Sequence, residues 1–214
     1  MYLDAVVKSS GCHCKWKPNL QGGDVYLTAR SSERGMAAVA ELMKEGCTVH
    51  FHQLDIDDTP SIERIRDFMK EKYGGIDVLV NNAAVAFHSD TTEPMGVQAE
   101  VTCKTNYWST KSACEILFPI LRPGARVVNV SSSAGKVANM KDSPIKEKLI
   151  SSGSTLTVKE LDEIMRQFVE SAKDGTYAEK GFKSTTYGMS KVGLSALTRI
   201  QQQEFDKVNC QVDL

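Results

Sequence analysis

The sequence has almost no net charge, few aromatic residues and no long hydrophobic run. Its 214 residues carry 26 Lys and Arg against 27 Asp and Glu, which gives a net charge of -1. Without a basic excess the chain has no general attraction for nucleic acid or anionic lipid, and we expect neither as a partner. No apolar stretch approaches the roughly 20 residues of a membrane-spanning helix, and the first residues lack a signal peptide's apolar core. We therefore predict a cytoplasmic protein with one compact domain over residues 1–214.

Cysteine is scattered along the chain. The six cysteines do not form the dense framework of a small secreted scaffold, so we expect reduced thiols. Cys12, His13 and Cys14 form a cluster of metal-binding residue types. Two thiols and an imidazole on adjacent residues cannot easily converge on one tetrahedral ion, and no CxxC partner follows. We predict no metal site.

Strand and helix patterns alternate along most of the chain. Short runs that favour strands lie at residues 24–29, 49–54, 76–80 and 126–130. The last two are almost continuously apolar, which is typical of strands covered on both faces by helices. Repeated βαβ units predict an α/β fold with a doubly wound, Rossmann-like parallel sheet.

Helical spacing fills the segments between these runs. One helix is expected before Gly46, from the spacing of four apolar residues, Met36, Val39, Ala40 and Met43. A second is expected to begin at Pro60 with Thr59 as its cap, and to bury an apolar face made of Ile62, Ile65, Phe68 and Met69.

The alternation breaks between residues 139 and 181. Within this segment Thr157 and Glu160 form a capping box, and five apolar residues follow at the spacing of one helical face: Leu161, Ile164, Met165, Phe168 and Val169. We interpret residues 139–181 as a helical insertion whose amphipathic helix docks on the domain.

Polar residues follow the predicted strands where a ligand crevice is expected, at the carboxyl ends of the parallel sheet. Ser131–Ser133 follow one strand and Asn81 and Asn82 another, and Asn106 can reach the same edge. Tyr187 and Lys191 are four residues apart, so on a helix the ammonium can stabilise a phenolate and make tyrosine a usable acid near neutral pH. Tyr107 and Lys111 have the same spacing and remain an alternative on spacing alone.

In order along the chain these motifs are NNAA at 81–84, Asn106, VNVSS at 128–132 and YGMSK at 187–191. Together they resemble the short-chain dehydrogenase/reductase family. The runs DVYLTAR at 24–30 and YGGIDVLVNNA at 73–83, with the long interval before Tyr187, resemble its cytosolic monomeric carbonyl reductases. The resemblance covers about residues 22–209, and Ala84 stands where the family usually has glycine.

The resemblance implies NADPH-dependent reduction of aldehydes, ketones or quinones to alcohols by hydride transfer. In that reading Tyr187 donates a proton to the carbonyl oxygen, Lys191 supports it and binds the nicotinamide ribose, Ser132 orients the carbonyl and Asn106 holds a relay water. Tyr107 is then a structural aromatic residue. The insertion would cover the surface through which other members associate, which predicts a monomer.

The resemblance also places the cofactor and substrate. Arg30 stands where an enzyme that uses NAD usually has an acid, Arg34 is close by, and two guanidiniums favour the 2′-phosphate of NADPH. Further residues implied in cofactor binding are Asp55, Ile56 and Asn82, with Tyr187 and Lys191. The substrate would contact Ser132, with Gln98 and the segment of Phe87 at the border of its pocket.

Two departures from the family stand out. After a first strand expected at residues 5–7, residues 8–18 lack the glycines of the family's TGxxxGxG turn, and Pro18 interrupts them. Residues 1–23 thus read as an atypical lead with an altered first βα unit, and the family's C-terminal strands are expected to be missing after Leu214. Two alternatives therefore stay open: a catalytically inactive isoform or fragment of a carbonyl reductase, and a reductase that acts on a steroid or sugar alcohol with NAD.

Overall fold

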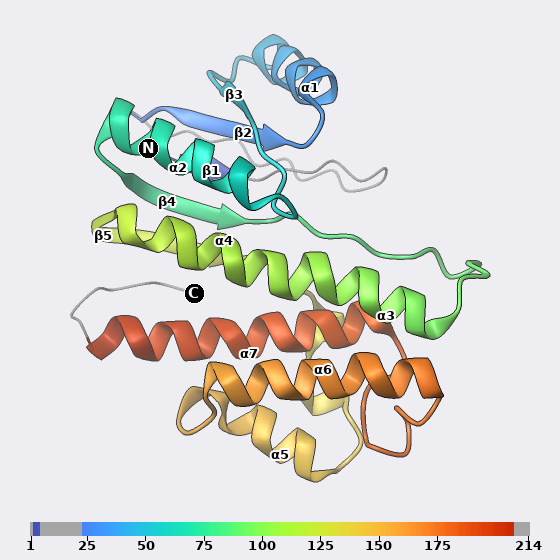
Figure 1. Ribbon diagram of the computed structural model, residues 1–214. Helices are drawn as coiled ribbons and strands as arrows, with labels where there is room; N and C mark the ends of the chain where they lie inside the picture. The colour runs from blue at the N-terminus through green and yellow to red at the C-terminus, as the bar shows by residue number, and fades with distance from the viewer. Residues whose placement is uncertain (1, 5–22, 208–214) are drawn as a thin grey trace. The chain divides into compact units, whose positions relative to one another are not determined.

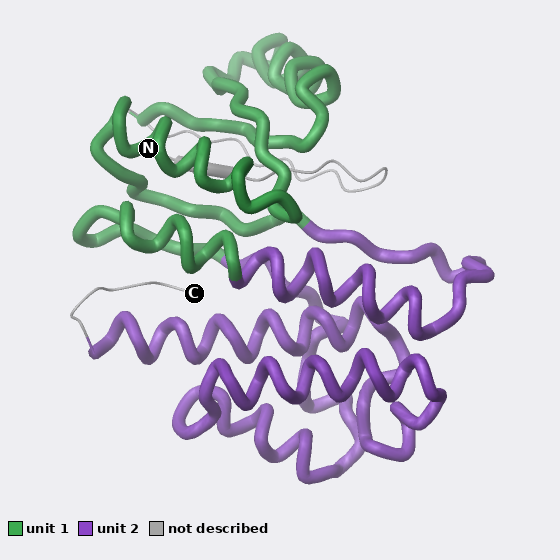
Figure 2. The backbone as a smooth tube through the Cα atoms, viewed as in Figure 1, with its two compact units in different colours: residues 1–83, 112–128, 213 green, residues 84–111, 129–212, 214 purple. Residues whose placement is uncertain are grey.

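The computed structural model describes residues 2–4 and 23–207 (Figure 1). The described chain forms two compact units (Figure 2): residues 1–83 with 112–128, and residues 84–111 with 129–212. Most of the predicted atypical lead lies outside the described residues, and so do the Cys12–Cys14 cluster and residues 208–214. No helix in the described part of the chain has the length and apolar character needed to cross a membrane.

The first unit is built around a five-stranded sheet of order β3-β2-β1-β4-β5. Its strands are β1 (Tyr2–Asp4), β2 (Val25–Ala29), β3 (His50–Gln53), β4 (Ile76–Asn81) and β5 (Leu121–Asn129). β1 pairs in parallel with both β2 and β4, and β2 pairs in parallel with β3. The predicted Rossmann-like α/β fold is therefore confirmed. Its first strand lies at Tyr2–Asp4, earlier than the expected residues 5–7, which are outside the described residues.

Helix α1 (Ser32–Lys44) contacts β2 and β3 through a different face from the one its apolar residues suggest. Met36 and Met43 are 57% and 55% exposed, whereas Gly35 is buried. A β-carbon at Gly35 would stand 2.0 Å from the Phe51 ring, so close contact through glycine takes the place of an apolar stripe. The helix was predicted from its spacing, but the buried face was not.

Helix α2 (Thr59–Tyr73) contacts β3 and β4. Its N-cap is Asp58, one residue before the predicted cap, and Pro60 occupies the first turn. Ile62, Ile65 and Met69 are completely buried, which confirms the apolar face read from the sequence.

The second unit is mainly helical. Its elements include α3 (Met95–Cys103), a π-helix (Lys104–Ser109), the first residues of α4 (Thr110–Leu117), α5 (Pro144–Ile150), α6 (Val158–Asp174) and α7 (Thr186–Lys207). Figure 1 shows α6 alongside α7, and α6 also packs on α3. One apolar core joins these helices and includes Tyr107, Phe168 and Val192.

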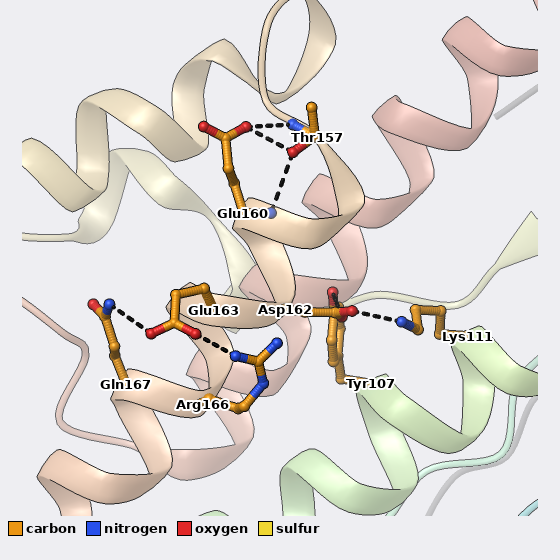
Figure 3. Close-up of polar contacts among 8 residues, drawn as sticks. All are labelled: Tyr107, Lys111, Thr157, Glu160, Asp162, Glu163, Arg166 and Gln167. Carbon is orange, nitrogen blue, oxygen red and sulfur yellow. Dashed lines mark hydrogen bonds and ion pairs between the residues drawn. The ribbon is translucent and has the colours of Figure 1, made fainter.

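The helix predicted inside residues 139–181 is α6. Its capping box is formed as expected: the Thr157 hydroxyl accepts from the Glu160 N–H, and the Glu160 carboxylate accepts from the Thr157 N–H (Figure 3). The five apolar residues of its predicted face are at most 6% exposed. A helix that buries so complete a stripe is held by packing rather than by its own propensity.

Candidate active site

A serine turn follows β5 in the second unit. Ser132 has an extended backbone and caps a short 3₁₀ turn, Ser133–Gly135, by accepting a 3.2 Å hydrogen bond from the Ala134 N–H. Because the Ser132 oxygen accepts this bond, its own O–H proton can be donated elsewhere. The hydroxyl is therefore available as a donor at the carboxyl end of β5.

Helix α7 carries Tyr187 and Lys191 on its first two turns. The Lys191 ammonium lies 5.7 Å from the centre of the Tyr187 ring and donates a 2.6 Å hydrogen bond to the Val130 carbonyl. Only 2% of Lys191 is exposed, and burial lowers its pKa from 10.5 to about 8. A buried cation beside a partly exposed phenol is an unusual and costly arrangement, of the kind that gathers at functional sites.

Two glycines bring the serine turn against α7. A β-carbon at Gly135 would stand 2.7 Å from the backbone carbon of Lys191, and one at Gly188 would stand 3.3 Å from the Ala134 carbonyl oxygen. The first distance is shorter than any real β-carbon contact tolerates, so Gly135 is required for this approach. The turn of Ser132 and the helix of Tyr187 are thus in direct backbone contact.

Side chains before the turn add further links to α7. The Ser131 hydroxyl lies 3.2 Å from the Lys191 carbonyl oxygen and 2.7 Å from the Ser195 hydroxyl. The Asn129 amide donates to the Thr198 hydroxyl and to the Gln201 side-chain carbonyl, each at 3.0 Å. Sequence reasoning missed these partners. Their signal was present, because positions 195, 198 and 201 are polar and follow Lys191 at helical spacing.

Asn106 lies in the π-helix and is completely buried. Its side chain donates to the Val85 carbonyl at 2.9 Å and to the Ser190 hydroxyl at 3.0 Å, and accepts from the Val85 N–H at 2.8 Å. Ser190 in turn donates to the Tyr187 carbonyl at 2.8 Å. Both amide hydrogens of Asn106 are therefore engaged, so its side chain acts as a brace for α7 and for the segment after β4. Ser190 connects the Asn106 side chain to the backbone of Tyr187, a role that the sequence analysis missed.

The predicted pocket residues Gln98 and Phe87 also lie in the second unit, and both are partly exposed. The Gln98 amide donates a 2.7 Å hydrogen bond to the Glu93 carbonyl, just before α3. This bond fixes the start of α3, which is a structural role that the sequence did not indicate.

The second pair with the Tyr-Lys spacing is engaged elsewhere. Tyr107 donates a 2.9 Å hydrogen bond to Asp162 on α6, and the Lys111 ammonium donates to the other oxygen of the same carboxylate at 2.6 Å (Figure 3). Tyr107 is completely buried, and the Lys111 and Asp162 side chains are less than a fifth exposed. This pair ties the insertion helix to the π-helix and α4.

The residues predicted to hold the cofactor's adenosine half lie in the first unit. Arg30 follows β2, Arg34 is in the first turn of α1, and both are exposed. Neither guanidinium pairs with a carboxylate among the described residues. Asp55 accepts from the Asp57 N–H at 3.0 Å, which holds the turn that also contains Ile56. Asn82 follows β4.

A family model described as short chain dehydrogenase matches residues 19–144. The chain is 46% identical over 192 residues to NADPH carbonyl reductase 1 of Sus scrofa, covering 87% of this chain and 66% of that protein. The human protein of the same name is 45% identical over 195 residues, covering 88% and 70%. The chain belongs to the short-chain dehydrogenase family. Within this family it resembles the NADPH carbonyl reductases, and it spans just under two thirds of the length of the Sus scrofa protein.

Solved structures agree with this placement. Salutaridine reductase from Papaver somniferum is 30% identical and superposes with a TM-score of 0.75 over 86% of this chain and 74% of its own. Menthone neomenthol reductase from Mentha piperita is 28% identical, with the same TM-score over 85% and 77%. Both reductases are therefore close matches in fold to this chain.

No group of three or more His, Cys, Asp or Glu side chains in the described part of the chain is placed to hold a metal ion. Cys103 and Cys114 are buried cysteines outside any disulfide, and burial raises the pKa of the Cys103 thiol to about 12. A thiol so far from its thiolate form is inert at neutral pH.

Proposed function

We propose that the protein binds NADPH and reduces aldehydes, ketones or quinones to alcohols. The observation that carries the proposal is the direct contact between the Ser132 turn and the helix of Tyr187 and Lys191, which brings a hydroxyl donor, a phenol and a buried ammonium into one unit. The 45–46% identity to NADPH carbonyl reductases supports the same chemistry.

The residues fit a nicotinamide cofactor in two places. Lys191 uses one of its three N–H donors on the Val130 carbonyl, which leaves donors for ribose hydroxyls. Arg30 and Arg34 present two exposed guanidiniums suited to the 2′-phosphate that distinguishes NADPH from NADH. Bound NADPH would supply the hydride. Asp55, Ile56 and Asn82 are proposed to line the adenine and ribose positions.

The protein's own side chains would handle the carbonyl oxygen. Ser132 donates a hydrogen bond to it and fixes its direction, and Tyr187 donates the proton as negative charge develops there. The Lys191 ammonium stabilises the resulting phenolate through its field. Asn106 is proposed to hold a relay water, while its side chain, with both amide hydrogens engaged, keeps α7 in place.

The acid is tested by Tyr187→Phe, with Tyr107→Phe as the matched control. We expect Tyr187→Phe to abolish NADPH-dependent reduction of an aldehyde while NADPH affinity stays near wild type. Tyr107→Phe removes a hydroxyl that is bonded to Asp162, so it is expected to lower the melting temperature and leave turnover largely intact. Equal losses of turnover in the two variants, both still folded, would show that the wrong tyrosine was chosen.

Cofactor choice is tested by calorimetric titration of the 214-residue chain with NADPH and then NADH. Tighter binding of NADPH that Arg30→Asp weakens far more than it weakens NADH would support the assignment. An absence of binding of either cofactor would instead favour the alternative of an inactive isoform or fragment. That alternative arises because residues 8–18 lack the glycines of the family's phosphate-binding turn. Tighter binding of NADH would favour an enzyme that acts on a steroid or sugar alcohol with NAD.

We further propose that the protein acts as a cytoplasmic monomer with no nucleic acid or membrane partner. Support comes from its near-zero net charge and from the burial of the α6 stripe against α3 and α7. Light scattering coupled to gel filtration checks the monomer: a mass of twice 23.5 kDa would contradict it.

A further inference from the structure

Lys183 stands beside the candidate active site but has no part in the chemistry proposed above. It lies in the segment 181–185 that leads into α7, four residues before Tyr187, and is partly buried. Its ammonium donates a 2.7 Å hydrogen bond to the Ala134 carbonyl, and the N–H of the same Ala134 donates to Ser132. Ala134 thus connects the ammonium to the hydroxyl that would hold the substrate carbonyl.

The stem of Lys183 also lies close to the phenol's helix. A β-carbon at Gly188, the residue after Tyr187, would stand 3.4 Å from Lys183 Cδ. The side chain therefore passes over the first turn of α7 on its way to the Ser132 turn. Lys183 thus bonds to Ala134, two residues after Ser132, and its stem passes close to Gly188, the residue after Tyr187.

The charge of Lys183 is not balanced within the described chain. No carboxylate there forms an ion pair with it, and burial alone acts on its pKa, which it lowers. Two acids of the insertion have other partners: Asp142 pairs with Lys146, and Asp174 accepts from Thr176. A partly buried cation without a counter-ion loses some of its hydration and gains no ion pair in return.

We propose that Lys183 binds a carboxylate on the substrate, so that the protein prefers carbonyl compounds with a negative charge near the reducible carbonyl. One of the three ammonium donors is used on Ala134, which leaves two donors for an oxyanion of a substrate bound at Ser132 and Tyr187. This assignment rests on the proposed reductase function for its substrate class. It narrows the proposed substrates from carbonyl compounds in general to carbonyl compounds that carry a negative charge.

The test compares 4-formylbenzoate with its methyl ester, which differ in charge but present the same aldehyde. With NADPH we expect a higher kcat/KM for the acid in the wild type. Lys183→Met should reduce kcat/KM for the acid by about 10- to 100-fold, the worth of a charged hydrogen bond, and leave the ester within about twofold. Lys183→Arg should retain much of the preference. Lys180→Met, which removes an exposed charge from the same loop, should leave the preference unchanged.

A purely structural role for Lys183 makes a different prediction. If the ammonium only fastens the Ser132 turn to the segment before α7, Lys183→Met lowers kcat/KM equally for acid and ester. Equal losses, or no preference for the acid in the wild type, would overturn the proposal.

Binding separates this proposal from the proposed function. Binding of 4-formylbenzoate is followed by ligand-detected NMR with wild type and Lys183→Met, without any turnover. Binding that weakens in Lys183→Met supports the anion site even if neither aldehyde is reduced, and in that case the reductase function alone fails. Binding that is the same in both proteins rejects the anion site whatever the turnover.

Discussion

Replacing Lys191 with Met should change the pH dependence of stability in a defined direction. Lys191 is 2% exposed, and burial lowers its pKa from 10.5 to about 8. At 1.36 kcal/mol per pKa unit, the folded protein gives up about 3 kcal/mol of stability at neutral pH to keep this cation buried. In the unfolded chain the lysine regains its ordinary pKa of 10.5. Between about pH 8 and 10.5 the unfolded state therefore binds more protons, and this cost falls as the pH rises.

Lys191→Met removes that cost but also leaves the Val130 carbonyl without its partner. The lost hydrogen bond costs about 1 to 3 kcal/mol at any pH. We therefore expect a variant that is equal to or slightly more stable than wild type at pH 7, and less stable at pH 10. The difference in unfolding free energy between variant and wild type should shift by about 2 to 3 kcal/mol across this interval.

Urea unfolding followed by circular dichroism at pH 7 and pH 10 measures this shift directly. Lys180→Met, at an exposed lysine, serves as the control and should show the same difference from wild type at both pH values. A Lys191→Met difference that is also constant with pH would refute the argument that burial governs this ammonium. Lys191→Met is also expected to lose reductase activity. Any stability that it gains at pH 7 is therefore gained at the expense of catalysis.

Three further substitutions test the packing of the second unit. Asp162→Asn removes the carboxylate that pairs with the partly buried Lys111 ammonium, and thermal unfolding should show a loss of about 2 kcal/mol. Glu163→Gln, on the exposed face of α6, should cost less than about 0.5 kcal/mol. Equal losses from the two changes would contradict the role of the buried pair. Gly135→Ala should lose about 1 to 3 kcal/mol in urea unfolding, because its methyl group would overlap the α7 backbone, and unchanged stability would contradict that contact. Thr157→Ala removes the α6 cap and should cost about 1 kcal/mol, which Thr157→Ser should largely restore; a similar loss from both changes would argue against the cap.

The fold was predictable because the spacing of hydrophobic residues along the sequence indicates which segments are helices and which are strands. The α2 and α6 faces, and the order of strands and helices, follow from apolar periodicity and capping residues that depend only on local sequence. The buried face of α1 was not predictable in this way. Its contact is made by Gly35 against Phe51, and a residue without a side chain leaves no mark in an apolar pattern.

The candidate site was only partly visible for a similar reason. Spacing marked both Tyr187 with Lys191 and Tyr107 with Lys111 as candidates, and spacing could not rank them. The difference lies in their surroundings, since the second pair shares the carboxylate of Asp162, about fifty residues away in the chain. Long-range partners of this kind are set by the packing of α6, which a local pattern does not encode.

The glycine contacts at Gly135 and Gly188 have a consequence for how this site could change. They join the Ser132 turn and the Tyr187 helix through main-chain atoms, in addition to the side-chain links that Asn106 and Ser131 make to α7. Residues around the candidate active site, Lys183 among them, can then be exchanged while Ser132 and Tyr187 keep their positions. The choice of substrate can therefore change independently of the reduction step. A single substitution around the candidate active site is enough to give a new substrate preference.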